Sequence, residues 1–344
     1  MKVALIVDSY KSWTGGPSEI LKETKKALQK KGIKVSIISK DILKKKKFYL
    51  RNELKKFDIC HLYGGWTFFH IKTYLVALSL KKKIIIHPLG FYEPWSLTQK
   101  KFKKKIALKL YQSKILMNSN LIHCASKLEQ KNILKINKDF KTKVIPYGIL
   151  NKYIKKTVKK KKISKRAIFF SRIHKKKGVE NLINAWKKVN NHDWKLDIYG
   201  PPENEKYLNQ LISSINKDDR IKIFKPIYNT KIKFKTFEKY DFMILPTYSE
   251  NFGFIVLEAL ARGLPVLTTK NTPWDKIKKK DSGWISGNSI NSLTLTLKKI
   301  FNLSNGNINY FYKKSKNAIS HANIYNWDYI SENYLNTYKK ILDE

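Results

Sequence analysis

Two carboxylates and a glycine lie close together in the segment 240–268. Glu250 belongs to a polar loop sequence, SENFG, and Glu258 follows it in an apolar stretch. Carboxylate oxygens accept hydrogen bonds from hydroxyl groups such as those of sugars. Gly253 lets a ligand approach the backbone closely, and amides at a helix start attract anions or sugar oxygens. The alternative is that Glu250 caps a helix and Glu258 lies on its solvated face.

A second candidate site comes from two basic residues after a predicted strand, 166–170. Arg172 and Lys177 flank a short loop that ends in Gly178. A forked guanidinium together with an ammonium group suits a diphosphate, which offers several anionic oxygens. In a chain with 71 basic residues such a pair says little by itself. Its interpretation therefore depends on the elements around it.

The elements that would position the carboxylates follow the order strand, loop, helix, strand. Residues 242–245 form a short apolar run that is typical of a buried parallel strand. Residues 254–262 repeat apolar side chains at helical spacing, and a glycine and a proline end this helix before the next apolar run, 266–268. Ligands of doubly wound sheets bind outside the carboxyl ends of the strands. The loop with Glu250 therefore lies where a ligand would bind.

The N-terminal half alternates strands and helices in the same way, which predicts a parallel α/β sheet. A loop with Gly15 and Gly16 follows the first strand, and a helix over 18–31 comes after it. This glycine pair lacks the third glycine of the dinucleotide fingerprint, and turn geometry is the more frequent explanation of such a pair. The strands are expected at 3–7, 34–39, 58–63 and 83–87.

The chain is long enough for two domains with sizeable cores. We expect an N-terminal domain over 1–150 and a linker over 151–165, which is dense in lysine and poor in apolar residues. A second domain is expected over 166–322. A C-terminal helix is expected over 323–344, where apolar and aromatic side chains recur at helical spacing.

The segment 246–266, PTYSENFGFIVLEALARGLPV, resembles the signature of the retaining glycosyltransferases of family 4, the glycosyl transferases group 1. Residues 171–178, SRIHKKKG, are similar to that family's G-R-(four residues)-K-G motif, with Ser171 in place of the glycine. Residues 143–149 resemble the sequence that closes the family's N-terminal domain, with Tyr147 in place of an asparagine.

The resemblance implies an α/β fold of the GT-B type, with two Rossmann-like domains facing each other across a cleft. It implies that Glu258 binds the ribose of a nucleotide-sugar, and that Arg172 and Lys177 bind its diphosphate and stabilise the leaving group. The transferred sugar would contact Glu250 and the loop around it, and the N-terminal glycine-rich loop would face the donor diphosphate and the acceptor. These loop residues are Ser249, Asn251, Phe252, Gly253, Gly15 and Gly16.

A histidine completes the set of catalytic candidates. The segment 87–97, HPLGFYEPWSL, resembles a motif of one branch of the family, in which a proline, a glycine and a later E-P-W recur. Leu89 stands where that branch has a histidine or arginine, and the histidine here precedes the proline. In the wider family a histidine after this strand contacts the donor sugar, which makes His87 the candidate. A buried histidine at the end of a strand is the alternative.

The net charge is +45, from 71 basic and 26 acidic residues. A field of that size attracts anionic surfaces such as nucleic acid or membranes. Residues 100–114 predict a basic amphipathic helix with Phe102, Ile106 and Leu110 at helical spacing. A helix of this kind can rest on an anionic membrane surface. We favour the alternative, in which the apolar stripe packs inward and the lysines still face the membrane. Because lysine, isoleucine and asparagine are abundant throughout, an AT-rich genome is the alternative source of the charge.

The expected compartment and the expected lack of a cofactor rest on three features that the sequence does not show: a signal peptide, a membrane span and a metal-ligand cluster. Its N-terminal apolar run is too short for a signal peptide or a membrane span, so we expect a cytoplasmic protein, peripheral at the inner face of the cytoplasmic membrane. Cys60 and Cys124 lie in apolar contexts typical of reduced core residues. The sequence shows no metal-ligand cluster, and GT-B enzymes generally work without a bound divalent metal. We therefore expect no metal and no cofactor.

The resemblance implies transfer of a hexose, with retention, to a glycan or lipid-linked acceptor in cell-surface polysaccharide or lipopolysaccharide synthesis. A phosphorylase or a nucleotide-sugar epimerase with the GT-B fold is the first alternative, because it would share much of the site. A nucleic-acid-binding protein is the second, prompted by the charge. It predicts a recognisable binding module, whereas the lysines are spread through every loop, so no specific nucleic-acid partner is expected.

Overall fold

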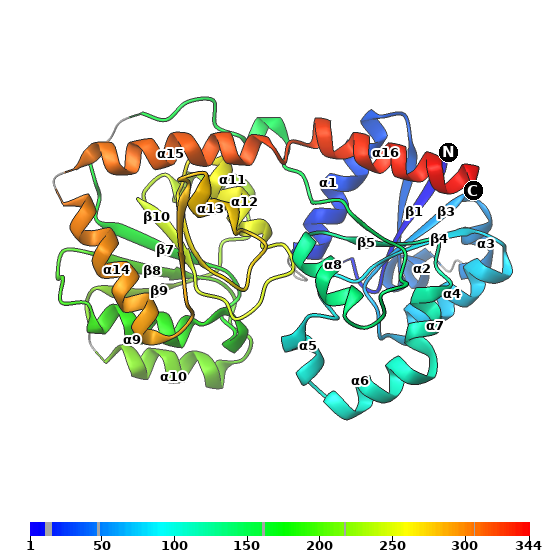
Figure 1. The fold of residues 1–344 in the computed structure, drawn as a ribbon, viewed down its shortest axis with the longest axis horizontal. Coiled ribbons are helices and arrows are strands. Elements are labelled where there is room, and N and C mark those ends of the chain that lie inside the picture. The colour runs from blue at the N-terminus through cyan, green and yellow to red at the C-terminus, as the bar shows by residue number, and fades with distance from the viewer. Residues whose placement is uncertain (11–15, 47–48, 160–161, 217, 306) are drawn as a thin grey trace. The chain divides into compact units, whose positions relative to one another are not determined.

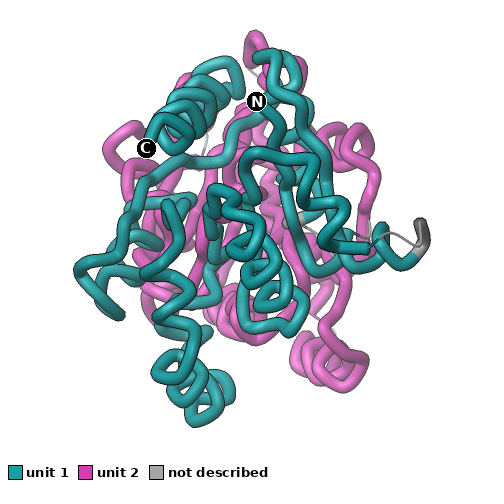
Figure 2. Tube along the Cα trace, turned by 90° about the vertical axis from the view of Figure 1, so that its right-hand side faces the viewer, with its two compact units in different colours: residues 1–150, 325–344 teal, residues 151–324 magenta. Residues whose placement is uncertain are grey.

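The computed structural model describes residues 1–10, 16–46, 49–159, 162–216, 218–305 and 307–344. These residues form two compact units, each with its own sheet (Figures 1 and 2). Unit 1 comprises Met1–Leu150 and Tyr325–Glu344, and unit 2 comprises Asn151–Ile324. Each sheet has six strands, and all neighbouring strands are parallel. The predicted α/β class with two Rossmann-like units is confirmed.

The sheet of unit 1 has the strand order β2-β1-β3-β4-β5-β6. Its central strands are buried on both faces, which explains why they read as continuous apolar runs. Side chains alternate between two core clusters, with Ala4 and Ile6 on one face and Val3 and Leu5 on the other. The strands are β1 (Lys2–Val7), β2 (Lys34–Ser39), β3 (Ile59–Tyr63), β4 (Lys83–His87), β5 (Leu121–Cys124) and β6 (Thr142–Val144).

Helices cover both faces of this sheet. Tyr74 of α4 and Ile133 of α8 belong to one cluster, whereas Leu28 of α1 belongs to the other. Cys60 and Cys124 are free thiols buried in the first cluster. The helices are α1 (Gly16–Lys30), α2 (Lys40–Lys46), α3 (Leu50–Lys55), α4 (Phe68–Ser79), α5 (Pro94–Thr98), α6 (Lys101–Ala107), the π-helix η2 (Leu108–Gln112), α7 (Ser113–Met117) and α8 (Lys127–Leu134).

The last helix, α16 (Trp327–Asp343), completes the core of unit 1. Its Trp327, Tyr334 and Tyr338 are buried in the same cluster as side chains of β1. The indole of Trp327 lies so close to Gly148 that a Cβ there would be 2.6 Å from the ring. The chain therefore needs a glycine at this crossing. The predicted C-terminal helix thus lies in the first unit, whose second segment begins at Tyr325.

The sheet of unit 2 has the strand order β12-β11-β10-β7-β8-β9. The apolar run at 242–245 forms β10, in which every residue is buried. The strands are β7 (Arg166–Phe170), β8 (Lys195–Tyr199), β9 (Ile221–Phe224), β10 (Phe242–Leu245), β11 (Val266–Thr269) and β12 (Gly283–Ser286).

The helices of unit 2 include one that the sequence did not predict, α15, which buries Lys314 and pairs it with Asp281. Residues expected as a linker also belong to this unit, since the amide of Lys155 donates to Ala261 O at 2.8 Å. The helices are the short η3 (Asn151–Tyr153) and η4 (Lys175–Lys177), then α9 (Val179–Lys188), α10 (Glu205–Ile215), α11 (Thr230–Phe237), α12 (Phe254–Ala261), α13 (Lys276–Lys279), α14 (Ile290–Ser304) and α15 (Ile308–Asn323).

Each sheet has a topological switch point beside its first strand. In unit 2, β7 lies between β8 and β10, and in unit 1, β1 lies between β2 and β3. The loops after β7 and β10 therefore leave the sheet side by side and lead in opposite directions, which is where ligands bind in such sheets. The predicted loops with Arg172 and Glu250 are these two loops.

The basic helix over 100–114 differs from its prediction. It is divided into α6, η2 and α7, and Phe102, Ile106 and Leu110 are exposed. The expectation that these apolar side chains pack inward is wrong, because the segment reaches the core through other residues, Leu108, Ile115 and Leu116. Across the described ranges, we find no helix with both the length and the apolar character needed to cross a bilayer.

Candidate functional site

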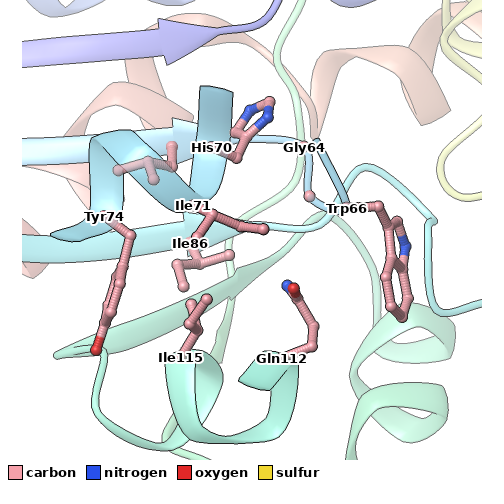
Figure 3. A pocket seen from close by; sticks show the side chains of 10 residues that line it. Gly64, Trp66, His70, Ile71, Tyr74, Ile86, Gln112 and Ile115 are labelled. Atoms are coloured by element: carbon pink, nitrogen blue, oxygen red, sulfur yellow. The ribbon is translucent and has the colours of Figure 1, made fainter. Parts of the chain in front are cut away.

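A small pocket opens in unit 1 beside the carboxyl ends of β3 and β4 (Figure 3). Gly64, Gly65 and Trp66 of the loop after β3 line it, together with His70 of α4 and Gln112 of η2. The indole N–H of Trp66 and the amide oxygen of Gln112 are buried and have no hydrogen-bond partner among the described residues. Because an unpaired buried polar atom is costly, these atoms suit one water molecule or one hydroxyl group, which is what so small a pocket admits.

His70 shapes the mouth of this pocket. Its Nε2 donates to Tyr63 O at 2.8 Å, and its Nδ1 lies 2.7 Å from the Thr67 hydroxyl. Burial lowers the pKa of His70, against the effect of the hydrogen bond to Tyr63. Gly64 has a φ of +124°, and a Cβ there would lie 2.9 Å from the imidazole. The close approach of ring and backbone therefore requires a glycine at this position.

The predicted glycine-rich loop after β1 is described only at its ends. Gly15 lies outside the described residues, and Gly16 is the first residue of α1. At the start of the loop, Asp8 Oδ1 lies 3.3 Å from the Thr67 hydroxyl. The described start of this loop therefore lies beside the loop after β3.

His87, predicted to contact the donor sugar, lies in the interior of unit 1. Its Nδ1 donates to His123 O at 2.6 Å, its Nε2 accepts from the Tyr147 hydroxyl, and no part of it is exposed. Burial holds the pKa of His87 well below its usual value. The alternation of β4 turns His87, like Ile85, toward the core beneath α16. The buried alternative describes this residue, and the predicted sugar contact is not supported.

His87 belongs to a cluster of three buried histidines. His61 Nδ1 accepts from the Tyr338 hydroxyl at 2.9 Å, and His61 Nε2 lies 3.2 Å from His123 Nδ1. His123 Nε2 donates to Ile145 O at 2.6 Å. Since a carbonyl only accepts, His123 carries its proton on Nε2, and His61 donates to its Nδ1. Every ring nitrogen is thus satisfied while the three rings are neutral.

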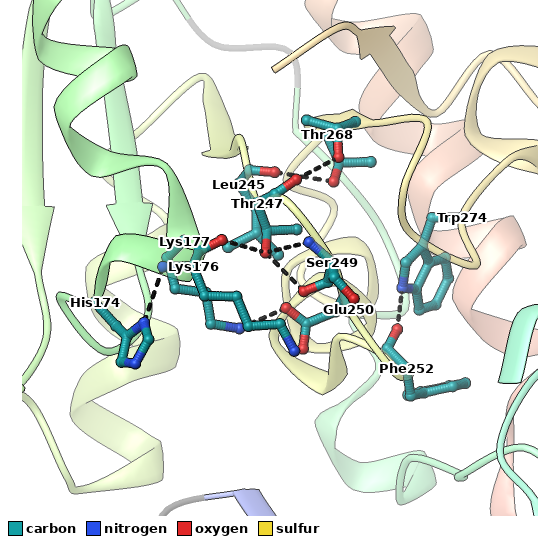
Figure 4. A network of polar contacts seen from close by, with 11 residues as sticks. His174, Lys176, Lys177, Leu245, Thr247, Ser249, Glu250, Phe252, Thr268 and Trp274 are labelled. Carbon is teal, nitrogen blue, oxygen red and sulfur yellow. Dashed lines mark hydrogen bonds and ion pairs between the residues drawn. The ribbon is translucent and has the colours of Figure 1, made fainter. Parts of the chain in front are cut away.

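In unit 2 the loops after β7 and β10 are tied together through their backbones (Figure 4). The amide of Tyr248 donates to Lys176 O at 2.8 Å, and the Thr247 hydroxyl lies 3.1 Å from the same carbonyl. Gly178, with a φ of +69°, passes so close to Pro246 that a Cβ would lie 2.3 Å from its carbonyl oxygen. The glycine of the K-G pair is therefore required where the two loops cross.

This crossing brings two of the predicted catalytic residues together. Lys177 Nζ lies 2.5 Å from Glu250 Oε2, and the two side chains keep only 12% and 15% of their surface exposed. Separating the two charges of a poorly solvated ion pair is costly, because each would be left uncompensated. The two side chains therefore stay together. The pair therefore fixes an ammonium group and a carboxylate at the switch point of the sheet.

Phe252 and Gly253 shape the start of α12. The ring of Phe252 is buried against Trp274, with ring centroids 5.4 Å apart, and Trp274 Nε1 donates to Phe252 O at 2.5 Å. Gly253 adopts a φ of +74° as the N-cap of the helix. Phe252 thus contributes packing through its side chain, and only its backbone amide is suited to the predicted ligand contact. The amides of the first helical turn have no intrahelical acceptor.

Ser249, Glu250 and Asn251 form the partly exposed part of this loop. The amide of Glu250 donates to Asn271 O at 3.2 Å, which anchors the loop to the segment after β11. Three polar side chains therefore stand together at the carboxyl-end edge of the sheet, as the sequence predicted.

Glu258 lies in the second half of α12 and is buried. Its carboxylate forms an ion pair with Lys233 of α11, and both side chains are largely shielded from solvent. Glu258 therefore belongs to a different ion pair from Lys177 and Glu250. Lys233 was missed by the sequence analysis because nothing in the local pattern of a lysine-rich chain distinguishes it from its neighbours.

Arg172 follows β7 and is exposed on the same loop as Lys177. Between them, His174 Nδ1 accepts from the amide of Lys176 at 2.9 Å, and its Nε2 lies 3.0 Å from Glu203 Oε1. Burial lowers the pKa of His174; the Glu203 carboxylate opposes this, whereas Arg172 and Lys177 add to it. His174 is a second residue that the sequence analysis did not single out. It shapes the backbone of the loop that carries both cations.

Arg172, Lys177 and Glu250 are the predicted charged residues at this edge. In the part of the chain that the structure describes, no three His, Cys, Asp or Glu side chains are grouped as metal ligands. Two cations beside a carboxylate and a helix start can bind a doubly charged phosphate group next to a group rich in hydroxyls.

Residues 151–319 match the family model of the glycosyl transferases group 1. An uncharacterized glycosyltransferase of Methanocaldococcus jannaschii is 28% identical over 179 residues, which cover 51% of this chain and 45% of that protein. A D-inositol 3-phosphate glycosyltransferase of an Arthrobacter species is 32% identical over 109 residues, which cover 30% of this chain and 26% of that protein. The matched regions thus span less than half the length of these curated relatives.

Solved structures share the whole fold at low sequence identity. Sucrose-phosphate synthase from Thermosynechococcus elongatus has a TM-score of 0.79 at 15% identity, over 99% of both chains. Anabaena HepE in complex with UDP-glucose has a TM-score of 0.76 at 16% identity, over 99% of this chain and 100% of that chain. This likeness establishes the fold, which is GT-B. The second unit therefore matches the family model of the glycosyl transferases group 1, and the fold of the whole chain matches these neighbours.

Proposed function

We propose that this chain transfers a hexose from a nucleotide-sugar to a glycan or lipid-linked acceptor. The observation that carries the proposal is the Lys177–Glu250 pair, which stands at the switch point of the sheet that matches the family model. The curated relatives are all named as glycosyltransferases, which supports the same activity.

In this proposal the loop after β7 binds the donor diphosphate. Arg172 offers a planar fork of N–H donors, and Lys177 offers a compact ammonium group. Breaking the anomeric bond expels a nucleoside diphosphate and builds negative charge on its oxygen. Cations that are already in position stabilise this charge without reorganisation. The salt bridge to Glu250 gives Lys177 that position before the donor arrives.

Glu250 has a second role, toward the transferred sugar. One of its oxygens pairs with Lys177, and a carboxylate retains further acceptor sites for sugar hydroxyls. Ser249 and Asn251 lie in the same loop, and the backbone amides near Phe252 and Gly253 complete the contacts to the sugar. The loop thus couples sugar recognition to the position of the lysine.

Glu258 binds the ribose hydroxyls of the donor in this proposal. Its ion pair with Lys233 orients the carboxylate for this role. Lys233 is therefore a positioning residue. The donor to test first is UDP-glucose, because a structural neighbour, HepE, was solved with that compound.

The reaction is proposed to proceed with retention and without a resident metal or other cofactor. Arg172 and Lys177 supply two positive charges on the loop assigned to the leaving group. The departing phosphate takes the proton of the acceptor hydroxyl, so no protein base is assigned. The bond that forms joins the acceptor oxygen to the anomeric carbon, and the bond that breaks joins that carbon to the phosphate oxygen.

The acceptor is assigned to unit 1. The pocket beside Trp66 and Gln112 has room for a single hydroxyl group of an acceptor and offers it two unpaired polar atoms. The net charge of +45 supports an acceptor presented at the anionic inner face of the cytoplasmic membrane. The reaction would then serve the synthesis of cell-surface polysaccharide or lipopolysaccharide.

The test is thermal stability against a panel of nucleoside diphosphates and nucleotide-sugars, with release of free nucleoside diphosphate measured in parallel. A ligand at 100 times its Kd adds about 2.7 kcal/mol of stability. We expect one nucleotide to stabilise the wild type, and Arg172→Ala and Glu258→Ala to lose that shift. Lys188→Ala, which removes an exposed charge from α9, is the matched control and keeps it.

Each other outcome points to a different function. Donor binding without release of nucleoside diphosphate in the presence of acceptors would indicate a phosphorylase or an epimerase. If no nucleotide raised the melting temperature and the protein bound nucleic acid in a salt-sensitive manner, the proposal would be refuted. The protein would then be a nucleic-acid-binding protein.

A further inference from the structure

Three apolar side chains on α6 and η2 point into solvent. Phe102, Ile106 and Leu110 keep 83%, 58% and 65% of their surface exposed. They recur every fourth residue, so they lie on one side of the helical segment. None of the residues of α6 (Lys101–Ala107) is buried, so this helix adds nothing to the core of unit 1. A contiguous apolar face of this kind marks a site that another surface covers.

The segment is fixed to unit 1 on both sides of the apolar face. Lys104 Nζ donates to Ser96 O at 2.5 Å and lies 5.8 Å above the ring of Trp66. At the other end, Gln112 and Leu116 are buried. Figure 1 shows α6 at the border of unit 1, apart from its sheet. The apolar face is therefore held in place on a helix, with its outer side open.

The same segment is strongly basic. Residues 100–118 contain no acidic residue, so no charge within the segment compensates its lysines. Most of these lysines are exposed around the apolar face. They are Lys100, Lys101, Lys103, Lys104, Lys105, Lys109 and Lys114.

Three surfaces could cover this apolar face: a second copy of the segment, a nucleic acid or an anionic lipid bilayer. Their charge and apolar character decide among them. A second copy of the segment would bring two uncompensated lysine clusters together, which is unfavourable. A nucleic acid would engage the lysines and leave the apolar side chains in water. An anionic lipid surface satisfies both, because phosphates at the headgroup level attract lysines while the boundary below accepts apolar side chains.

We propose that residues 100–117 dock unit 1 on an anionic phospholipid bilayer. Phe102, Ile106 and Leu110 enter the boundary between headgroups and acyl chains, and the surrounding lysines contact lipid phosphates. This assigns membrane contact to one face of one segment, beyond the general attraction that a net charge of +45 produces. The docking is independent of sugar transfer and is measured without a donor.

One consequence concerns the acceptor and rests on the proposed function. Gln112 of η2 lines the pocket of Figure 3, so docking brings that pocket to the lipid surface. The class of acceptor that fits there is one anchored in the bilayer by a lipid. If vesicle binding succeeded and transfer failed, the proposed function would fall and the docking would stand.

The test compares sedimentation of the full chain with vesicles of phosphatidylcholine alone and with vesicles that contain phosphatidylglycerol, at physiological salt. We expect binding to the anionic vesicles, and at least tenfold weaker binding by the double variant Phe102→Glu/Ile106→Glu. The matched control is Leu295→Glu on α14, an apolar residue that is equally exposed at 69%. It should bind within twofold of the wild type. Because all three positions are exposed, the variants should keep the melting temperature of the wild type.

Insertion is measured with an environment-sensitive dye on Phe102→Cys, with Leu295→Cys as the control. The native thiols, Cys60 and Cys124, are buried and do not react in the folded chain. Anionic vesicles should shift the emission of the dye at position 102 to the blue and leave that at position 295 unchanged. The proposal is overturned if the wild type ignores anionic vesicles, or if the double variant binds equally well. In the second case the chain adsorbs through its overall charge.

Discussion

Lowering the pH from 7 to 5 is expected to weaken unit 1, because three buried histidines there are satisfied only as neutral rings. Burial lowers the pKa of His61, His87 and His123. The neighbouring rings lower the pKa of His61 and His87 further. A second proton on His123 would lie on Nδ1 and face the Nε2–H of His61, so two N–H groups would point toward each other. The ring hydroxyls around the cluster belong to Tyr63, Tyr147, Tyr334 and Tyr338.

The magnitude follows from His123, whose pKa is lowered from 6.5 to about 4. The unfolded chain binds a proton below pH 6.5, whereas the folded chain binds it only below about 4. Between these values each pH unit costs about 1.4 kcal/mol of unfolding free energy per histidine. At pH 5 His123 alone therefore removes about 2 kcal/mol. His61 and His87 act in the same direction, so stability is full above pH 6.5 and falls as the pH decreases.

The assay is urea unfolding at pH 7 and pH 5, with hydrogen exchange to locate the weakened amides in β3, β4 and β5. His123→Gln retains a donor for Ile145 O and removes the titration, so its pH dependence should be smaller by about 2 kcal/mol. His192→Asn, at an exposed position, should keep the full pH dependence. Equal unfolding free energies of the wild type at the two pH values would refute the reasoning.

Three further outcomes are expected. Lys177→Ala should reduce sugar transfer by about 10²–10³-fold, as for other charge-stabilising donors, and Glu250→Gln should reduce it as well because it releases the lysine; both are measured as turnover with a saturating donor. Gly178→Ala should lower the melting temperature strongly, since its Cβ would lie 2.3 Å from Pro246 O at a φ of +69°; an unchanged melting curve would disprove this crossing. Transfer activity should persist in excess EDTA, whereas a loss that Mg²⁺ or Mn²⁺ restores would contradict the metal-free proposal.

Part of the fold could be predicted because its signals are local. The apolar run of β10 and the helical periodicity of α12 depend only on neighbouring residues, and their bounds agree with the structure within a residue or two. The switch point then follows from the alternation of strands and helices. Both Lys177 and Glu250 could be placed in loops at the carboxyl ends of strands for the same reason. Their direct contact was not predicted.

Other features depend on contacts between distant residues. Lys233 pairs with Glu258 through a helix, α11, that carries no distinctive pattern, so the sequence offers no signal for it. His174 is similar, because its partner Glu203 lies in a different loop. In a chain with 71 basic residues, the few lysines with a defined partner cannot be distinguished by composition.

Two of the expectations that differ from the structure share one cause. Periodicity shows which side chains lie on one face, but not which face the rest of the chain covers. For Phe102 and its two companions the inward direction was expected, and the structure leaves them exposed. For His87 a contact at the strand end was expected, and the alternation of β4 turns the ring into the core.

The return of α16 has a consequence for synthesis of the chain. Unit 2 is a continuous segment, Asn151–Ile324, inserted within unit 1, whose second part is Tyr325–Glu344. Because domains fold as their residues leave the ribosome, unit 2 can fold while unit 1 still lacks Trp327, Tyr334 and Tyr338. Until those rings arrive, one face of the first sheet is covered only in part, by α1. The core of unit 1 is therefore completed only after the whole of unit 2 has been synthesised, and until then the incomplete first unit is a substrate for chaperones.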